Sequence, residues 1–129
     1  MKFSLLVLSS PYSQQGASQA LDFAKACIKE GHEIYRVFFY CDGVHHGSQL
    51  HTPQQDELNL NKEWLALKHA HNLDLVVCIA AALKRGVLSQ QEANRYEQTQ
   101  FNLADGFELS GLGQLLDAQL QSDQVVTFS

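Results

Sequence analysis

The chain has 129 residues, a length that fits a single domain with a hydrophobic core of its own. Nine basic and fourteen acidic residues give a net charge of −5, which argues against direct binding of nucleic acid through its phosphates. No apolar run reaches the length of about 18 residues that a membrane span requires. Three cysteines, an odd number at unrelated spacings, indicate reduced thiols and a cytoplasmic location.

The first forty residues predict a strand, a helix and a second strand. Residues 2–8 are mostly apolar, and we interpret them as a strand because the run is short, ends near Pro11 and lacks the cleavage site of a signal peptide. Residues 17–30 show apolar positions at helical spacing, and Gly31 ends that helix. Residues 32–40 give the second strand, so the three elements form a βαβ unit with a right-handed crossover.

The same alternation continues to the end of the chain. A polar connection is expected at 41–58, a helix at 59–71, a strand at 73–77 and a short helix that stops at Gly86. Ser89 followed by Glu92 indicates a capping box that opens another helix. A short strand at 107–109, a helix around 115–120 and a last strand at 125–128 complete the pattern.

This order of elements predicts an α/β fold over residues 1–129: a single-domain, three-layer sandwich with a mostly parallel five-stranded sheet and helices on both faces. We expect the flavodoxin-like strand order 2-1-3-4-5. In that order the first strand lies between the second and the third, and the ends of the first and third strands meet at the topological switch point.

Cys78 is the candidate catalytic residue, because it lies where the strand at 73–77 ends and the next helix begins. A thiol there meets the free N–H groups and the positive end of the helix dipole, which favour the thiolate that attacks sulfur. A small buried hydrophobe at a strand end explains the same residue equally well, since free cysteine is among the most buried residue types. Position alone leaves both interpretations open.

The other two cysteines are weaker candidates. Cys41 also follows a strand, but a turn signal comes next, so no helix N-terminus is expected to face it, and the carboxylate of Asp42 disfavours a thiolate. In the predicted strand order Cys41 and Cys78 lie roughly 9–10 Å apart, too far for a disulfide without backbone movement. Cys27 lies on the apolar face of the first helix, where we expect it in the core.

Neither a metal nor a cofactor is expected. Cys41, His45, His46 and His51 match no zinc module, and their loop has no regular framework to fix tetrahedral geometry. The loop at 9–16 opens a helix and is a weak candidate for phosphate or flavin, because it lacks the GxGxxG and GxxxxGK[ST] patterns. No GxSxG elbow is present to support a hydrolase.

Three segments carry a resemblance to a known family. They are Val37-Phe38-Phe39-Tyr40 followed by Gly43-Val44, the run Cys78-Ile79-Ala80-Ala81-Ala82-Leu83-Lys84-Arg85-Gly86, and Phe107-Glu108-Leu109-Ser110-Gly111-Leu112-Gly113. Together they resemble the DsrE family of sulfur-relay proteins, most closely the sulfurtransferase subunit of the bacterial TusBCD complex, from Met1 to Phe128. Lys84 stands where a second arginine is expected, and Cys41 and the His45–His46 pair are not features of the family.

The resemblance implies that Cys78 carries sulfur as a persulfide, taken from a TusA-like donor and passed to a TusE-like acceptor. It implies 2-thiouridine at the tRNA wobble position as the end of the relay, and assembly with TusB- and TusC-like subunits as a dimer of heterotrimers. Lys84 and Arg85, at the far end of the helix, are expected to be dipole partners or docking charges. The alternatives are DsrE-type sulfur trafficking in sulfur oxidation and a non-catalytic flavodoxin-like binding module.

Overall fold

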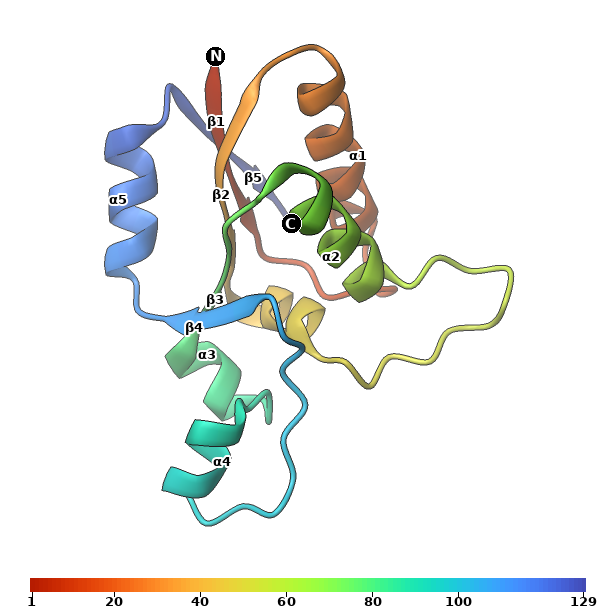
Figure 1. Ribbon diagram of the computed structural model, residues 1–129, viewed down its shortest axis with the longest axis vertical. Coiled ribbons are helices and arrows are strands. Elements are labelled where there is room, and N and C mark those ends of the chain that lie inside the picture. The colour runs from red at the N-terminus through yellow and green to blue at the C-terminus, as the bar shows by residue number, and fades with distance from the viewer.

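Five short apolar runs form one parallel sheet in the computed structural model, which describes residues 1–129 (Figure 1). The strands are β1 (Lys2–Val7), β2 (Glu33–Phe39), β3 (Leu75–Cys78), β4 (Phe107–Ser110) and β5 (Gln124–Phe128). Every neighbouring pair of strands is parallel. The predicted α/β fold with a five-stranded parallel sheet is therefore confirmed.

The predicted flavodoxin-like strand order is wrong, because the sheet runs β4-β3-β2-β1-β5. β2 is the central strand: Phe39 lies opposite Val7 of β1 and opposite Val77 of β3. The physical reason is burial. Val37, Phe38 and Phe39 are consecutive apolar residues, and a central strand buries all three because helices cover both faces of the sheet and a strand pairs with each edge. The carboxyl ends of β2 and β3 are consequently direct neighbours.

Helices cover both faces of the sheet, as predicted. α1 (Gln15–Lys29) and α2 (Leu60–His71) pack against each other on one face, whereas α5 (Gly113–Gln121) covers the other face (Figure 1). The short elements η1 (Cys41–Gly47), α3 (Ile79–Lys84) and α4 (Gln90–Arg95) lie beyond the carboxyl ends of the strands. None of the helices combines the length and the apolar composition needed to cross a membrane.

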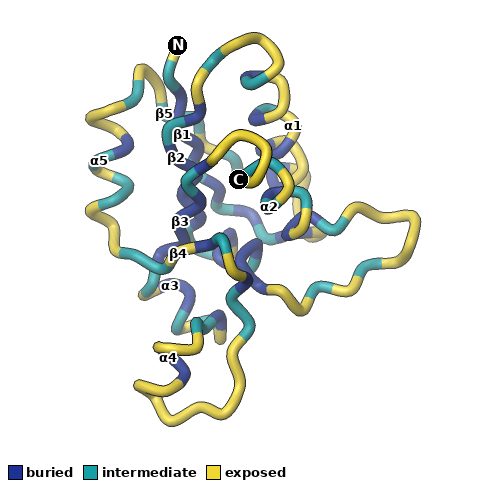
Figure 2. The backbone as a smooth tube through the Cα atoms, in the orientation of Figure 1, coloured by how far each residue is buried: buried dark blue, intermediate teal, exposed yellow.

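The core lies between the sheet and its helices. Buried residues are concentrated on β1, β2 and β3, whereas most residues of the segment before α2 and of the segment after α4 are exposed (Figure 2). Trp64 of α2 is fully buried and packs edge-to-face on Phe39, with ring centroids 5.5 Å apart. The apolar spacing that predicted α2 therefore reflects its contact with the central strand.

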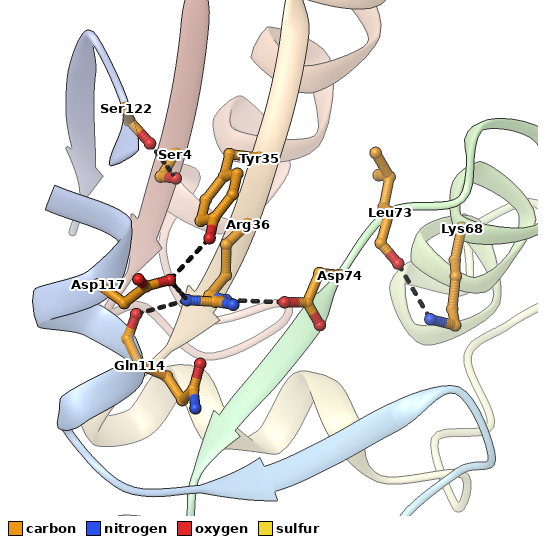
Figure 3. A network of polar contacts seen from close by, with 9 residues as sticks. All are labelled: Ser4, Tyr35, Arg36, Lys68, Leu73, Asp74, Gln114, Asp117 and Ser122. Carbon is orange, nitrogen blue, oxygen red and sulfur yellow. Dashed lines mark hydrogen bonds and ion pairs between the residues drawn. The ribbon is translucent and has the colours of Figure 1, made fainter. Parts of the chain in front are cut away.

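α5 is held on its face of the sheet by a buried cation, as Figure 3 shows. Arg36 of β2 donates from Nε to Asp74 Oδ2 at 2.7 Å and from Nη1 to Asp117 Oδ2 at 2.9 Å. Nη1 also donates to the carbonyl oxygen of Gln114, and the Tyr35 hydroxyl donates to Asp117 Oδ2 at 2.7 Å. Sequence periodicity gave no indication of this network.

The connection at 41–58 is only partly the polar loop that we predicted. Residues Cys41–Gly47 form the 3₁₀ helix η1, and Gly43 packs so closely on β1 that a Cβ there would collide with the carbonyl oxygen of Val7. Half of the predicted capping box is confirmed: the Ser89 side chain accepts a hydrogen bond from the Glu92 N–H at 3.2 Å, but the Glu92 carboxylate does not return one to Ser89. Helix caps could therefore be predicted from the local sequence. The close contact between Gly43 and β1 could not, because it depends on tertiary structure.

Candidate functional site

Cys78 is the last residue of β3 and the residue that immediately precedes α3. Its backbone is extended (φ −62°, ψ 119°), and the helix starts at Ile79, as the change of sequence pattern predicted. In the sheet Cys78 lies opposite Ser110, the last residue of β4. The residue is only 2% exposed, yet its side chain lines a hollow at this end of the sheet.

The hollow has a volume of about 490 Å³ and lies where β2, β3 and β4 end. Its lining residues are Tyr40, Cys41, Cys78, Ile79, Ala80, Ala81, Lys84, Arg85, Gly111 and Leu112. We predicted Cys78 at the meeting of the first and third strands, and the strand order moves it to the junction of the second, third and fourth. A larger hollow of about 850 Å³ beyond Lys84 contains no cysteine, histidine or carboxylate. The hollow of about 490 Å³, which is lined by Cys41 and Cys78, is therefore the candidate site for thiol chemistry.

Two cations line the same hollow as Cys78. Lys84 and Arg85 were expected at the far end of the helix, away from the thiol, but α3 has only six residues and is about 9 Å long, so both of its ends border the hollow. Arg85 donates from Nε to Asp42 Oδ1 at 2.8 Å and from Nη1 to the Ala81 carbonyl oxygen at 3.2 Å. The Arg85 guanidinium holds the pKa of the Asp42 carboxyl below its usual range.

Cys41 also lines this hollow, which corrects two predictions. The estimate of 9–10 Å between Cys41 and Cys78 assumed that β1 lies between β2 and β3, but β2 and β3 pair directly. A helix does begin at Cys41, since it is the first residue of η1. Cys41 is half-buried, and its φ of +53° is a left-handed conformation, uncommon for a residue with a side chain.

Cys27 lies apart from the hollow, on the buried face of α1. Burial raises the pKa of its thiol, which keeps the sulfur protonated and unreactive. The prediction that Cys27 is a core residue is confirmed. Of the three free cysteines, only Cys41 and Cys78 share a site.

Two of the three histidines of the 41–58 segment bind backbone carbonyl oxygens through their rings. Nε2 of His46 donates to the Ser9 carbonyl oxygen at 3.0 Å, and Nε2 of His51 donates to the His45 carbonyl oxygen at 2.7 Å. Nowhere in the chain do three or more His, Cys, Asp or Glu side chains gather in a way that could hold a metal ion. The loop at 9–16 is tied to the start of α2, because the Tyr12 hydroxyl donates to the Leu58 carbonyl oxygen at 2.8 Å.

Comparison with known proteins finds relatives along almost the whole chain. Residues 1–128 match the DsrE/DsrF-like family. The chain belongs to that family. It is 44% identical over 128 residues to the "Putative sulfurtransferase DsrE" of Allochromatium vinosum, and 48% identical over 128 residues to a "Sulfurtransferase TusD homolog" of Vibrio vulnificus. Each match covers 99% of this chain and 98% of the relative.

The predicted membership of the DsrE family is thus confirmed, and these relatives place the chain among the sulfurtransferases. The fold agrees with a solved structure, the ychN protein from E. coli, at a TM-score of 0.79 and 23% identity. That match covers 99% of both chains. The two chains accordingly share one overall fold along nearly their full lengths.

The sequence predicted the position of Cys78 at the end of a strand, but it did not bring the other residues of the hollow together. Lys84 and Arg85 could have been placed there from the shortness of the helix between Cys78 and Gly86. Cys41 could not have been placed there from local patterns, because its position depends on the pairing of β2 with β3. No sequence signal indicated the ion pair between Asp42 and Arg85.

Proposed function

We propose that the chain is a sulfurtransferase that carries sulfur as a persulfide on Cys78, taken from a TusA-like donor and passed to a TusE-like acceptor. The observation that carries this proposal is the position of Cys78, at the end of β3 on a hollow that also holds Lys84 and Arg85. Family membership supports it, because the DsrE protein of Allochromatium vinosum and the TusD homolog of Vibrio vulnificus are both named sulfurtransferases.

The chemistry needs one thiolate and two exchanges. The Cys78 thiolate attacks the outer sulfur of a donor persulfide, so that a bond from Cys78 Sγ to that sulfur forms while the donor leaves as a thiolate. An acceptor thiolate then attacks the same sulfur, and Cys78 leaves as a thiolate. Each state of the site carries a negative charge on sulfur. The cationic side chains of Lys84 and Arg85 and the first N–H groups of α3 offset that charge.

The end of the relay is proposed to be 2-thiouridine at the tRNA wobble position, in line with the relatives named TusD homolog. Sulfur trafficking in sulfur oxidation is the second candidate, favoured by the 44% identity to a protein named DsrE. Measuring which acceptor protein takes sulfur from loaded Cys78 separates the two. The strand order does not support the third alternative, a flavodoxin-like binding module, because it differs from the flavodoxin-like order.

We further propose that the chain works in the cytoplasm as part of a dimer of heterotrimers with TusB- and TusC-like subunits. Three free cysteines suit a reducing compartment. Leu112, Leu116 and Leu120 are between 51% and 75% exposed on and beside α5, and β5 is an edge strand. Apolar side chains and a free strand edge of this kind are typical of surfaces that another subunit covers.

The central test is the variant Cys78→Ser. It should lose all sulfur transfer and keep the fold, because serine is nearly isosteric but its hydroxyl stays protonated and forms no persulfide. Mass spectrometry after incubation with a persulfidated donor should show one added sulfur atom on Cys78 of the parent protein and none at residue 78 of the variant. Cys27→Ser is the matched control and should load normally in its folded fraction. A Cys78→Ser protein that transfers sulfur at the parent rate would refute the assignment.

A further inference from the structure

We propose that Cys41 is a second sulfur-carrying thiol, which takes the sulfur over from Cys78 within the same hollow. This inference rests on the proposed function of Cys78. The sequence offered no reason to pair the two residues, since Cys41 is not a feature of the family and the predicted strand order kept them apart. The structure supplies the reason, because the two thiols lie at the ends of adjacent strands.

The pairing of β2 with β3 sets the two cysteines side by side. Phe39 lies opposite Val77 in the parallel register, so the next step along each strand brings Tyr40 beside Cys78, and Cys41 follows directly. Neighbouring strands are about 4.8 Å apart, and one residue along a strand adds about 3.3 Å. Both cysteines line the hollow of about 490 Å³, so a sulfur atom attached to either one lies in a space that they share.

The segment that carries Cys41 is fastened in place. Asp42, the next residue, accepts from Arg85 Nε at 2.8 Å, which ties the start of η1 to the end of α3. On the other side, the Tyr40 N–H donates to the Val7 carbonyl oxygen at 3.0 Å. Between these two anchors Cys41 adopts a φ of +53°, a conformation that glycine adopts more readily. A residue kept in an unfavourable conformation at a functional site is a reason to look for a role of its side chain.

Cys41 is more exposed than Cys78, which suits it to pass sulfur to an acceptor. Cys78 is 2% exposed, whereas Cys41 is half-buried at the rim of η1. A sulfur atom on Cys41 is therefore more open to an incoming acceptor than one on Cys78. Lys84 and Arg85 line the same hollow and offset negative charge there, and Arg85 also pairs with the Asp42 carboxylate that adjoins Cys41.

The transfer step balances without any other reactant. The Cys41 thiolate attacks the outer sulfur of the Cys78 persulfide, a bond from Cys41 Sγ to that sulfur forms, and the bond from Cys78 Sγ to it breaks. Cys78 leaves as a thiolate and takes up the proton that Cys41 lost. The transferred sulfur keeps its oxidation state, so neither an oxidant nor a reductant is consumed.

The test loads the full chain with glutathione persulfide, traps the thiols by alkylation at successive times, and locates the added sulfur by peptide mass spectrometry. In the parent protein the sulfur should appear on Cys78 first and on Cys41 later. Cys78→Ser should leave Cys41 without sulfur. Cys41→Ser should keep its sulfur on Cys78 and release it several-fold more slowly to an added acceptor thiol. Cys27→Ser is the control and should behave as the parent.

The outcomes separate this inference from the proposed function. Sulfur on Cys78 of Cys41→Ser, with none reaching Cys41 in the parent, would leave the proposed function standing and overturn the second carrier. Direct loading of Cys41 in Cys78→Ser to the parent level would overturn it too, as would a Cys41–Cys78 disulfide with release of hydrosulfide. If Cys78 of the parent takes up no sulfur, the proposed function fails and this inference with it. Cys41→Gly, which suits the positive φ, replaces Cys41→Ser if the serine variant folds poorly.

Discussion

His46 is fully buried, although it belongs to a segment whose composition predicts a polar loop. Its Nε2 donates to the Ser9 carbonyl oxygen, and the ring lies against Phe39 with centroids 5.2 Å apart. Removal from water disfavours the imidazolium, so burial lowers the pKa of His46 to about 4. The neutral ring is thus a part of the core that joins η1 to the end of β1.

This burial predicts a loss of stability on mild acidification. The pKa of His46 is about 4 in the folded chain and about 6.5 in the unfolded chain, so the unfolded chain binds more protons between these values. Stability is therefore complete above about pH 6.5 and falls as the pH falls toward 4. The free energy of unfolding should drop by about 2 kcal/mol between about pH 6.5 and pH 5, where carboxylates remain ionised.

Urea unfolding of the parent chain and of His46→Gln at several pH values checks this expectation. Glutamine retains an N–H donor for Ser9 but does not titrate, so the variant should show a shallower dependence on pH. His69→Asn, which removes an exposed imidazole from α2, is the matched control and should keep the slope of the parent. A parent protein whose stability is flat over this range would contradict the buried neutral state.

Single residues were predictable where the cause is local. Cys78 could be placed at a strand end because an apolar run gives way to helix-forming residues at that point. Cys27 could be placed in the core because it shares a helical face with apolar neighbours. Cys41 and His46 could not be placed correctly, since their surroundings depend on which strands are adjacent and on the contact between Gly43 and β1.

The packing of α5 on the sheet depends on polar contacts more than the packing of α1 and α2 does. Ala118 is its only fully buried side chain, and two of its leucines, Leu116 and Leu120, face solvent. Arg36 joins this helix to β2 and β3 through Asp117, the Gln114 carbonyl oxygen and Asp74 (Figure 3). Because α5 follows Gly111 and Leu112 directly, the network also fixes that wall of the Cys78 hollow.

Arg36→Met should therefore loosen α5 while leaving the rest of the sheet in place. The change removes three hydrogen bonds of a charged donor, and the two carboxylates that it leaves are partly exposed, so we expect a loss of about 2–3 kcal/mol. Hydrogen exchange should increase most at the amides of α5. Lys25→Met breaks the exposed pair with Glu63 and is the control, expected to cost less than about 1 kcal/mol. Equal losses for the two variants would show that the network adds nothing.

Elements were predicted better than their arrangement. The strand and helix positions follow from apolar periodicity and from stop signals such as Gly31 and Gly86, and the structure confirms them within a few residues. η1 was missed because its buried residues are Gly43, Val44, His46 and Gly47, a set in which valine is the only large apolar side chain. The Arg36 network was missed because its partners lie 38 and 81 residues away along the chain.

The strand order of the whole molecule could not be read from local patterns. All five strands are parallel, so the chain crosses over between each pair, and connection lengths alone fit more than one order. The order followed here takes β1 to β4 one step at a time in the same direction and returns β5 to the far side of β1. That path makes the ends of β2, β3 and β4 consecutive, and the hollow of Cys78 follows from it.

Assembly with related subunits is the prediction that concerns the whole surface. The exposed leucines of α5 and the free edge of β5 lie on a chain with a net charge of −5. Apolar contacts are screened little by salt, unlike ion pairs between exposed charges. A complex formed through these apolar surfaces should therefore persist when the salt concentration is raised.

Sedimentation of the chain alone, and mixed with TusB- and TusC-like subunits, measures this directly. We expect the mixture to sediment as a dimer of heterotrimers at micromolar concentration, at low and at high salt, and the chain alone to sediment as a smaller species. A complex that forms only at low salt would mean that charges rather than leucines hold it together. A chain that sediments as a monomer in both samples would contradict the assembly, and would leave Leu116 and Leu120 exposed to water in the working protein.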